Sequence, residues 1–92
     1  MAKLIIPTPL RKFTNDSAHF ESIKSTVKDV IGDLISQHDG LRHHLLDDKG
    51  DIRSFVRIYV GDEDIQQLEK ENTAVESNTV ISIIPAIAGG SN

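Results

Sequence analysis

One helical stripe with strand-like segments on either side constrains this chain more than any other feature. Apolar side chains recur at the i, i+3, i+4, i+7 and i+8 positions of an amphipathic helix: Val27, Val30, Ile31, Leu34 and Ile35. The other apolar segments are short and rich in β-branched residues, which favours strands. Because a lone amphipathic helix must bury its stripe against another layer, we expect a two-layer α+β domain.

The residues around the stripe predict where this helix begins and ends. Ser25 or Thr26 is expected to cap its start, because a hydroxyl can accept from the free amides of the first turn. Gly40 suits the left-handed residue just past a helix end. Gly32, inside the helix, costs about 1 kcal/mol relative to alanine and is expected to permit close packing on a sheet. Residues 41–46 predict a second short helical turn.

The remaining pattern predicts the strands. In chain order they are residues 4–6, 19–24, 52–60, a short strand or turn at 65–68, and a central strand at 79–86. Residues 8–17, 61–64 and 72–78 are expected to be loops and turns. A hairpin, a crossover helix and a last strand inserted beside the first make a β-grasp arrangement, with one main helix on one face of a mixed sheet. Residues 1–86 are the expected domain, and residues 87–92 a flexible C-terminal tail.

Alternation along residues 52–60 predicts two faces for the strongest strand. Ile52, Ser54, Val56, Ile58 and Val60 should face the helix, and Arg53, Phe55, Arg57 and Tyr59 should lie on the outer face. Because aromatic side chains and arginine are enriched at interface centres, we expect Phe55, Arg57, Tyr59 and Ile84 to form a docking surface for a partner. An ordinary half-exposed sheet face is the alternative.

Composition excludes several classes of function. The 92 residues suffice for one domain, and the formal charge of −4 argues against nucleic acid as a general partner. No apolar run approaches the roughly 18 residues that a membrane span needs. Since cysteine is absent, disulfides, zinc–thiolate sites and a cysteine nucleophile are excluded. We expect a cytoplasmic protein.

No constellation of residues predicts catalysis or metal binding. His43 and His44 are adjacent, so on a helix their side chains diverge by about 100°. Residues 47–51 lack the ligand spacing of a calcium loop and indicate a polar turn. The acidic run at residues 62–64 could steer a basic partner or simply form a solvated hairpin turn. We therefore expect no catalytic residue and no bound metal.

Three segments resemble a known family. The last apolar strand, Val80-Ile81-Ser82-Ile83-Ile84-Pro85, leads through Ala86-Ile87-Ala88 to the diglycine Gly89-Gly90. The segment Phe55-Val56-Arg57-Ile58-Tyr59-Val60-Gly61-Asp62-Glu63-Asp64-Ile65 and the start Ile5, Pro7, Leu10 and Arg11 complete the match. Together they resemble the β-grasp sulfur-carrier proteins, which are relatives of ubiquitin. The pattern is closest to the branch that supplies sulfur for cysteine synthesis.

The resemblance implies a protein co-substrate and not an enzyme. An ATP-dependent activating enzyme would adenylate the carboxylate of Gly90, and sulfur would then replace AMP to give a thiocarboxylate. In the cysteine branch, a synthase dependent on pyridoxal phosphate (PLP) supplies the acceptor. The carrier itself would bind no cofactor. Gly89 and Gly90 would form the narrow arm that reaches the partner's site, because glycine lacks a Cβ, and Ala88 would precede them in the tail.

Two residues, Ser91 and Asn92, follow the diglycine. Relatives made as precursors lose such an extension to a zinc metalloprotease, and we expect the same cleavage after Gly90. An addition foreign to the natural protein is the alternative. The other functions left open are sulfur donation to thiamin, molybdopterin or a secondary metabolite, a ubiquitin-like modifier that forms isopeptide bonds, and a plain binding module.

Overall fold

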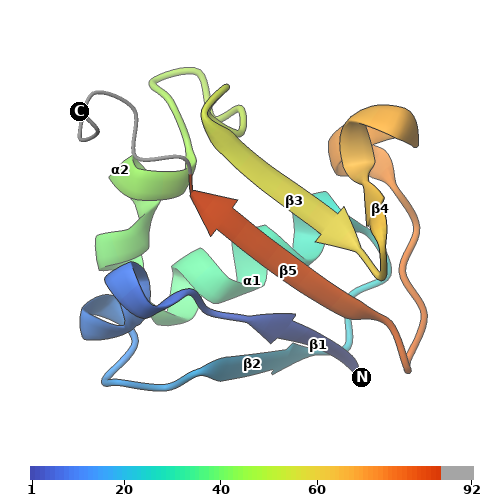
Figure 1. Cartoon of the computed structure of the whole chain (residues 1–92). Helices are drawn as coiled ribbons and strands as arrows, with labels where there is room; N and C mark the ends of the chain where they lie inside the picture. Colours follow the sequence, from blue (N-terminus) through green and yellow to red (C-terminus); the bar gives the residue numbers. More distant parts are fainter. Residues whose placement is uncertain (86–92) are drawn as a thin grey trace.

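The computed structural model describes residues 1–85, in which a mixed five-stranded sheet carries one long helix on one face (Figure 1). The main elements are β1 (Ala2–Ile5), β2 (His19–Ser22), α1 (Val27–Gln37), β3 (Val56–Val60), β4 (Glu63–Asp64) and β5 (Val80–Pro85). The strand order is β2-β1-β5-β3-β4, with β5 parallel to β1 and the other pairs antiparallel. This confirms the predicted hairpin, crossover helix and central last strand.

The helix α1 forms where the stripe predicted it. Thr26 is the N-cap, and its hydroxyl accepts from the backbone N–H of Asp29 at 3.2 Å. All five stripe residues are buried. They join the core side chains of the sheet, which include Leu4, Ile58, Ile81 and Ile83.

Both glycine predictions for this helix are wrong. Gly40 does not adopt the left-handed conformation and lies in the 3-10 helix η2 (Asp39–Leu41). A methyl group there would come within 3.1 Å of the Phe13 ring, so close approach of that ring explains the glycine. Gly32 is exposed, and a methyl group on it would meet no described atom within 4 Å, so it does not serve close packing on the sheet.

The strongest predicted strand is shorter than the alternation suggested. β3 begins at Val56, because Ser54 and Phe55 form a turn closed by a hydrogen bond from Val56 N–H to the carbonyl of Arg53. Ile52 instead makes an isolated bridge with Leu46. The alternation of apolar and polar side chains thus continued through a turn of the chain, and the residue types alone do not reveal this turn.

The connections hold more structure than the sequence predicted. The expected loop at residues 8–17 contains the 3-10 helix η1 (Thr8–Phe13), which buries Leu10. The expected turn at residues 61–64 contains β4, and the 3-10 helix η3 (Ile65–Gln67) follows it. Another 3-10 helix, η4 (Lys70–Asn72), comes before β5. The expected short helical turn at residues 41–46 is confirmed as α2 (Arg42–Leu45).

No helix within residues 1–85 is long and apolar enough to cross a membrane.

Candidate functional site

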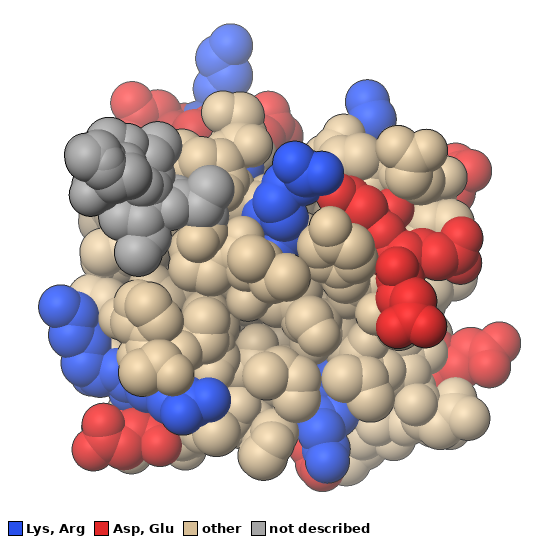
Figure 2. All heavy atoms as spheres, viewed as in Figure 1, with Lys and Arg blue, Asp and Glu red and all other residues tan. Residues whose placement is uncertain are grey.

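The two faces of the sheet differ in what covers them. α1 packs on one face, and Figure 1 shows no helix over the middle of the other. On this outer face the register places Arg57 opposite Ile84 and Tyr59 opposite Ser82. Figure 2 looks onto the same face and shows that its middle is largely uncharged.

The structure brings the four predicted docking residues to one region, with one change of position. Arg57, Tyr59 and Ile84 lie on the neighbouring strands β3 and β5, and Ile84 is 50% exposed. Phe55 was expected on the strand, and this is wrong. It lies in the turn just before Val56 and keeps an exposed fraction of 39%. We define Phe55, Arg57, Tyr59 and Ile84 as the outer-face patch.

The outer-face patch lies at the end of β5 from which the chain continues toward its C-terminus. Val56, next to Phe55, pairs with Pro85, the last residue of β5. Gly90 follows Pro85 by five residues, which span at most about 18 Å when fully extended. A protein that contacts the outer-face patch is therefore within reach of Gly90. Ala88, Gly89, Gly90, Ser91 and Asn92 lie outside the described residues, as does the expected boundary at residue 86.

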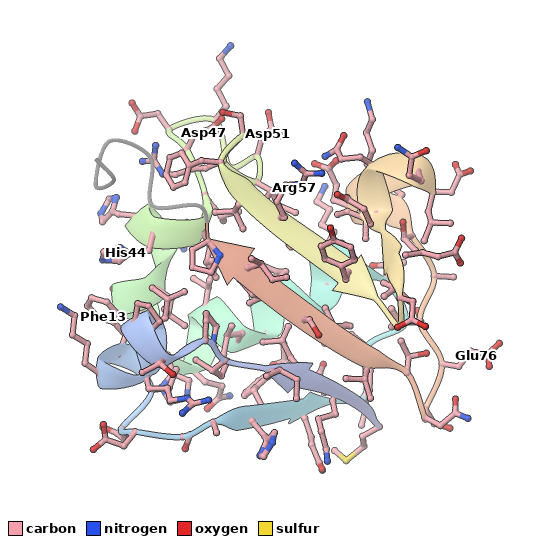
Figure 3. All side chains as sticks on the ribbon, viewed as in Figure 1. Phe13, His44, Asp47, Asp51, Arg57 and Glu76 are labelled. Atoms are coloured by element: carbon pink, nitrogen blue, oxygen red, sulfur yellow. The ribbon has the colours of Figure 1, made fainter. Side chains whose placement is uncertain are left out.

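Arg57 is held by an ion pair that the sequence analysis missed. Oδ2 of Asp64 accepts from Nη2 of Arg57 at 2.8 Å and from its Nε at 2.9 Å. Figure 3 shows Arg57 extending from β3 toward β4. The side chain of Asp64 is only 9% exposed and that of Arg57 is 54% exposed. Asp64 is thus neither a steering charge nor a solvated turn residue.

A signal for this pair exists in the sequence. Gly61 and Asp62 connect β3 to β4, and Gly61 has the positive φ of +62° that such a tight connection uses. This hairpin places Asp64 opposite Tyr59, so that Arg57 is its diagonal neighbour on the same face. Counting register across the turn would have found the pair.

Hydrogen bonds favour the charged form of Asp64. The backbone N–H of Gln66, which donates to Oδ1 at 2.9 Å, lowers the pKa of Asp64 most, burial opposes it, and Arg57 lowers it further. The hydrogen bond to Asp64 in turn raises the pKa of Arg57. Both side chains are charged at neutral pH.

A second arginine contacts Phe55, one of the two aromatic members of the outer-face patch. The guanidinium carbon of Arg53 lies 5.9 Å from the centroid of the Phe55 ring, within cation–π distance. Nε of Arg53 donates to the backbone carbonyl of His43 at 2.8 Å. Phe55 is therefore exposed, but its ring is in contact with the side chain of Arg53.

Acidic side chains flank the outer-face patch on the β4 side (Figure 2). In the hairpin that joins β3 to β4, Asp62 and Glu63 are exposed, whereas Asp64 is buried. The predicted steering role stays a prediction for Asp62 and Glu63 only.

Two of the other polar candidates, Asp47 and His44, have structural partners. Asp47 accepts from the backbone N–H groups of Lys49 and Asp51, which confirms the polar turn. The His44 ring packs on Phe13 with 4.5 Å between centroids (Figure 3). Across residues 1–85, no three His, Asp or Glu side chains are grouped so that they could hold a metal ion.

Comparison with known proteins adds sequence and structural relatives. The model of the ThiS family matches residues 4–90. The sulfur carrier protein CysO of Mycobacterium tuberculosis is 36% identical over 87 residues, which cover 92% of this chain and 94% of the relative. A chain in the crystal structure of the Amycolatopsis orientalis BexX/CysO complex is 31% identical, with a TM-score of 0.88 over 98% of this chain and 100% of that one. The crystal structure of Mycobacterium tuberculosis CysO matches with a TM-score of 0.85 at 31% identity, over 95% and 100% of the two chains.

Proposed function

Because this chain belongs to the ThiS family, we propose that it is a sulfur carrier that donates sulfur for cysteine synthesis. The observation that carries the proposal is the identity of 36% with a sulfur carrier protein over nearly the whole of both chains. The family match also extends to residue 90, so it includes the diglycine. The chain acts as a co-substrate, and its partner enzymes perform the catalysis.

The chemistry takes place at the carboxyl group of Gly90. A carboxylate oxygen attacks the α-phosphorus of ATP on the activating enzyme, pyrophosphate leaves, and an acyl adenylate forms. A sulfide donor then attacks the acyl carbon, the bond to AMP breaks, and a thiocarboxylate remains. The carrier needs no cofactor, because ATP is bound and consumed by the partner. We expect this reaction in the cytoplasm, where ATP is available to the partner.

The thiocarboxylate is the nucleophile of the second half-reaction. Its sulfur becomes bonded to the β-carbon of an activated serine derivative held by a PLP-dependent cysteine synthase, and the bond from that carbon to the activated oxygen group breaks, so that this group leaves with the electron pair. The product is a thioester, whose acyl group moves from sulfur to the α-amino group of the new cysteine. Hydrolysis of the resulting amide releases cysteine and restores the carboxylate of Gly90. A zinc metalloprotease is the hydrolase we propose for this step.

Residues after Gly90 must be removed before activation. While the peptide bond to Ser91 is intact, Gly90 has no free carboxylate to adenylate. We assign this cleavage to the same zinc metalloprotease, since both substrates present an amide on Gly90.

The outer-face patch is the proposed docking surface for the activating enzyme. It combines the exposed apolar side chains of Phe55 and Ile84 with the exposed Arg57 on the sheet face that no helix covers. Its position at the end of β5 keeps the docked enzyme close to Gly90. The crystallised complex of a relative with BexX supports assembly of this fold with a partner protein.

Intact-mass spectrometry tests the proposal. The chain ending at Gly90 is incubated with the activating enzyme of the same genome, ATP and a sulfide source. The expected product gains the mass difference between sulfur and oxygen. A chain that ends at Ala88 is the control and should stay unchanged.

Three outcomes would contradict the proposal. Thiocarboxylate formation with Ser91 and Asn92 still attached would refute trimming. Conjugates on lysine without any thiocarboxylate would indicate a modifier. Full rescue of a cysteine-requiring strain by a chain lacking Gly89 and Gly90 would indicate a plain binding module.

A further inference from the structure

We propose that Asp64 is a positioning residue for partner docking, which holds the guanidinium of Arg57 in one orientation so that it can donate to a carbonyl or carboxylate oxygen of the activating enzyme. This role rests on the proposed function and adds to it a buried residue outside the outer-face patch. Asp64 would act through Arg57, without touching the partner itself.

The two oxygens of Asp64 have separate tasks. Oδ1 accepts from the backbone N–H of Gln66 at 2.9 Å, which fixes the carboxylate relative to the main chain of η3. Oδ2 accepts from both Nε and Nη2 of Arg57. Because the acceptor is fixed by the backbone, the guanidinium it binds has a defined position as well.

The held arginine still has donors to offer. A guanidinium carries five N–H groups, and the contacts to Asp64 occupy one on Nε and one on Nη2. The other three N–H groups lie in a plane that the contact with Asp64 fixes, and the Arg57 side chain is 54% exposed. Ile84 lies directly opposite Arg57 on β5, so apolar surface adjoins these donors. Such a surface fits a partner that presents an oxygen acceptor beside an apolar side chain.

Holding Arg57 before docking reduces the entropy lost on docking. The partner would have to immobilise a freely rotating arginine, and this cost raises the dissociation constant by about 2- to 12-fold. This gain requires the Asp64 carboxylate at its observed place. A negative charge elsewhere on the β4 edge would not supply it.

Asp62 offers a matched control for charge. Asp62 lies in the turn before β4 and Asp64 lies in β4, two residues later, but Asp62 is exposed and Asp64 is buried. Asp62→Asn and Asp64→Asn remove the same formal charge. Asparagine at position 64 keeps an oxygen that can accept from Gln66 N–H, so the cap of η3 survives.

The experiment measures docking kinetics without chemistry. The chain ending at Gly90 binds the activating enzyme with ATP omitted, and association and dissociation rates are recorded at two salt concentrations. Asp64→Asn and Asp62→Asn are each tested alone and combined with Arg57→Ala, and melting temperatures check that every variant is folded.

A positioning role predicts a specific pattern. Asp64→Asn should speed dissociation by about 2- to 12-fold and should have no further effect once Arg57 is alanine. Asp62→Asn should alter only the association rate, in a salt-dependent manner. Arg57→Lys, which keeps the charge and loses the planar fork, should resemble Asp64→Asn.

Other results would overturn the assignment. If Asp64→Asn and Asp62→Asn behave alike, or if the effects of Asp64→Asn and Arg57→Ala simply add, Asp64 acts only as a charge or a structural residue. If the wild-type chain forms the thiocarboxylate and the Asp64→Asn variant docks as well as the wild type, only the positioning role fails. If the wild-type chain neither docks nor forms the thiocarboxylate, the proposed function itself fails, and this role with it.

Discussion

The hydroxyl of Ser22, at the end of β2, donates a hydrogen bond to Oδ2 of Asp33 on α1 at 2.8 Å. The same hydroxyl accepts from the backbone N–H of Lys24 at 3.1 Å. Ser22 is 1% exposed, whereas Asp33 is half-buried and Lys24 is exposed. The hydrogen bond between Ser22 and Asp33 links the edge strand β2 to α1, whose apolar stripe is buried in the core.

Ser22→Ala should therefore destabilise the domain by about 1 kcal/mol, because it removes the hydrogen bond to Asp33 and the acceptor of the Lys24 N–H. Urea denaturation gives the change in free energy of unfolding. Ser36→Ala is the matched control, since its exposed hydroxyl bonds only within α1, to the carbonyl of Asp33, and should change stability by less than about 0.5 kcal/mol. Equal losses for the two variants would contradict the role of the Ser22 contact.

Gly32→Ala should stabilise the domain by about 0.8–1 kcal/mol, because alanine is the better helix former. The added methyl group meets no described atom within 4 Å. Thermal or urea unfolding measures the gain. Gly50→Ala should do the opposite, because Gly50 has a φ of +85° that a side chain disfavours. A loss of stability for Gly32→Ala would show that the glycine has a role that the fold of residues 1–85 does not explain.

The turn at Asp47 should make stability depend on acid. The backbone N–H of Asp51 is the main cause that lowers the pKa of Asp47, with help from that of Lys49. Because the pKa of Asp47 is lower in the folded chain than in the unfolded chain, the unfolded chain binds the proton more readily as pH falls. The stabilisation that Asp47 contributes is therefore present above about pH 4 and is lost as pH falls below that value. Asp47→Asn should flatten this acid limb of an unfolding curve, whereas Asp48→Asn, an exposed neighbour, should not. Unchanged acid dependence for Asp47→Asn would refute the argument.

Phe55→Ala should slow adenylation and leave the melting temperature nearly unchanged. The ring is partly exposed in a turn and contributes little to the core, but it belongs to the outer-face patch. Pyrophosphate release by the activating enzyme measures the rate. Ile23→Ala removes an apolar side chain that is 76% exposed and lies outside the patch, so it should have no effect on adenylation. Equal rates for wild type and Phe55→Ala would remove Phe55 from the docking surface.

Local pattern predicted the elements whose residues interact with near neighbours in sequence. The stripe of α1 and its Thr26 cap are of this kind, and both are confirmed. The β-branched run of β5 predicted a central strand, and it lies between β1 and β3. These features depend on spacing and residue type alone.

The errors fall where a contact between different segments decides. Gly40 resembled a helix cap, but the ring of Phe13, far away in sequence, explains it. Ile52 fitted the period of β3, but it bridges to Leu46, and a turn at Ser54 and Phe55 separates it from Val56. Asp64 looked like part of a solvated acidic run until the hairpin register placed it beside Arg57.

The sequence by itself determined the chemistry that we propose, since the diglycine, the absence of cysteine and the β-branched run of the last strand need no neighbour to be recognised. Only the tertiary structure decided which charges on the outer face are available to a partner. The reason is that a carboxylate's role depends on its burial and on the donors around it, and both arise from strand pairing.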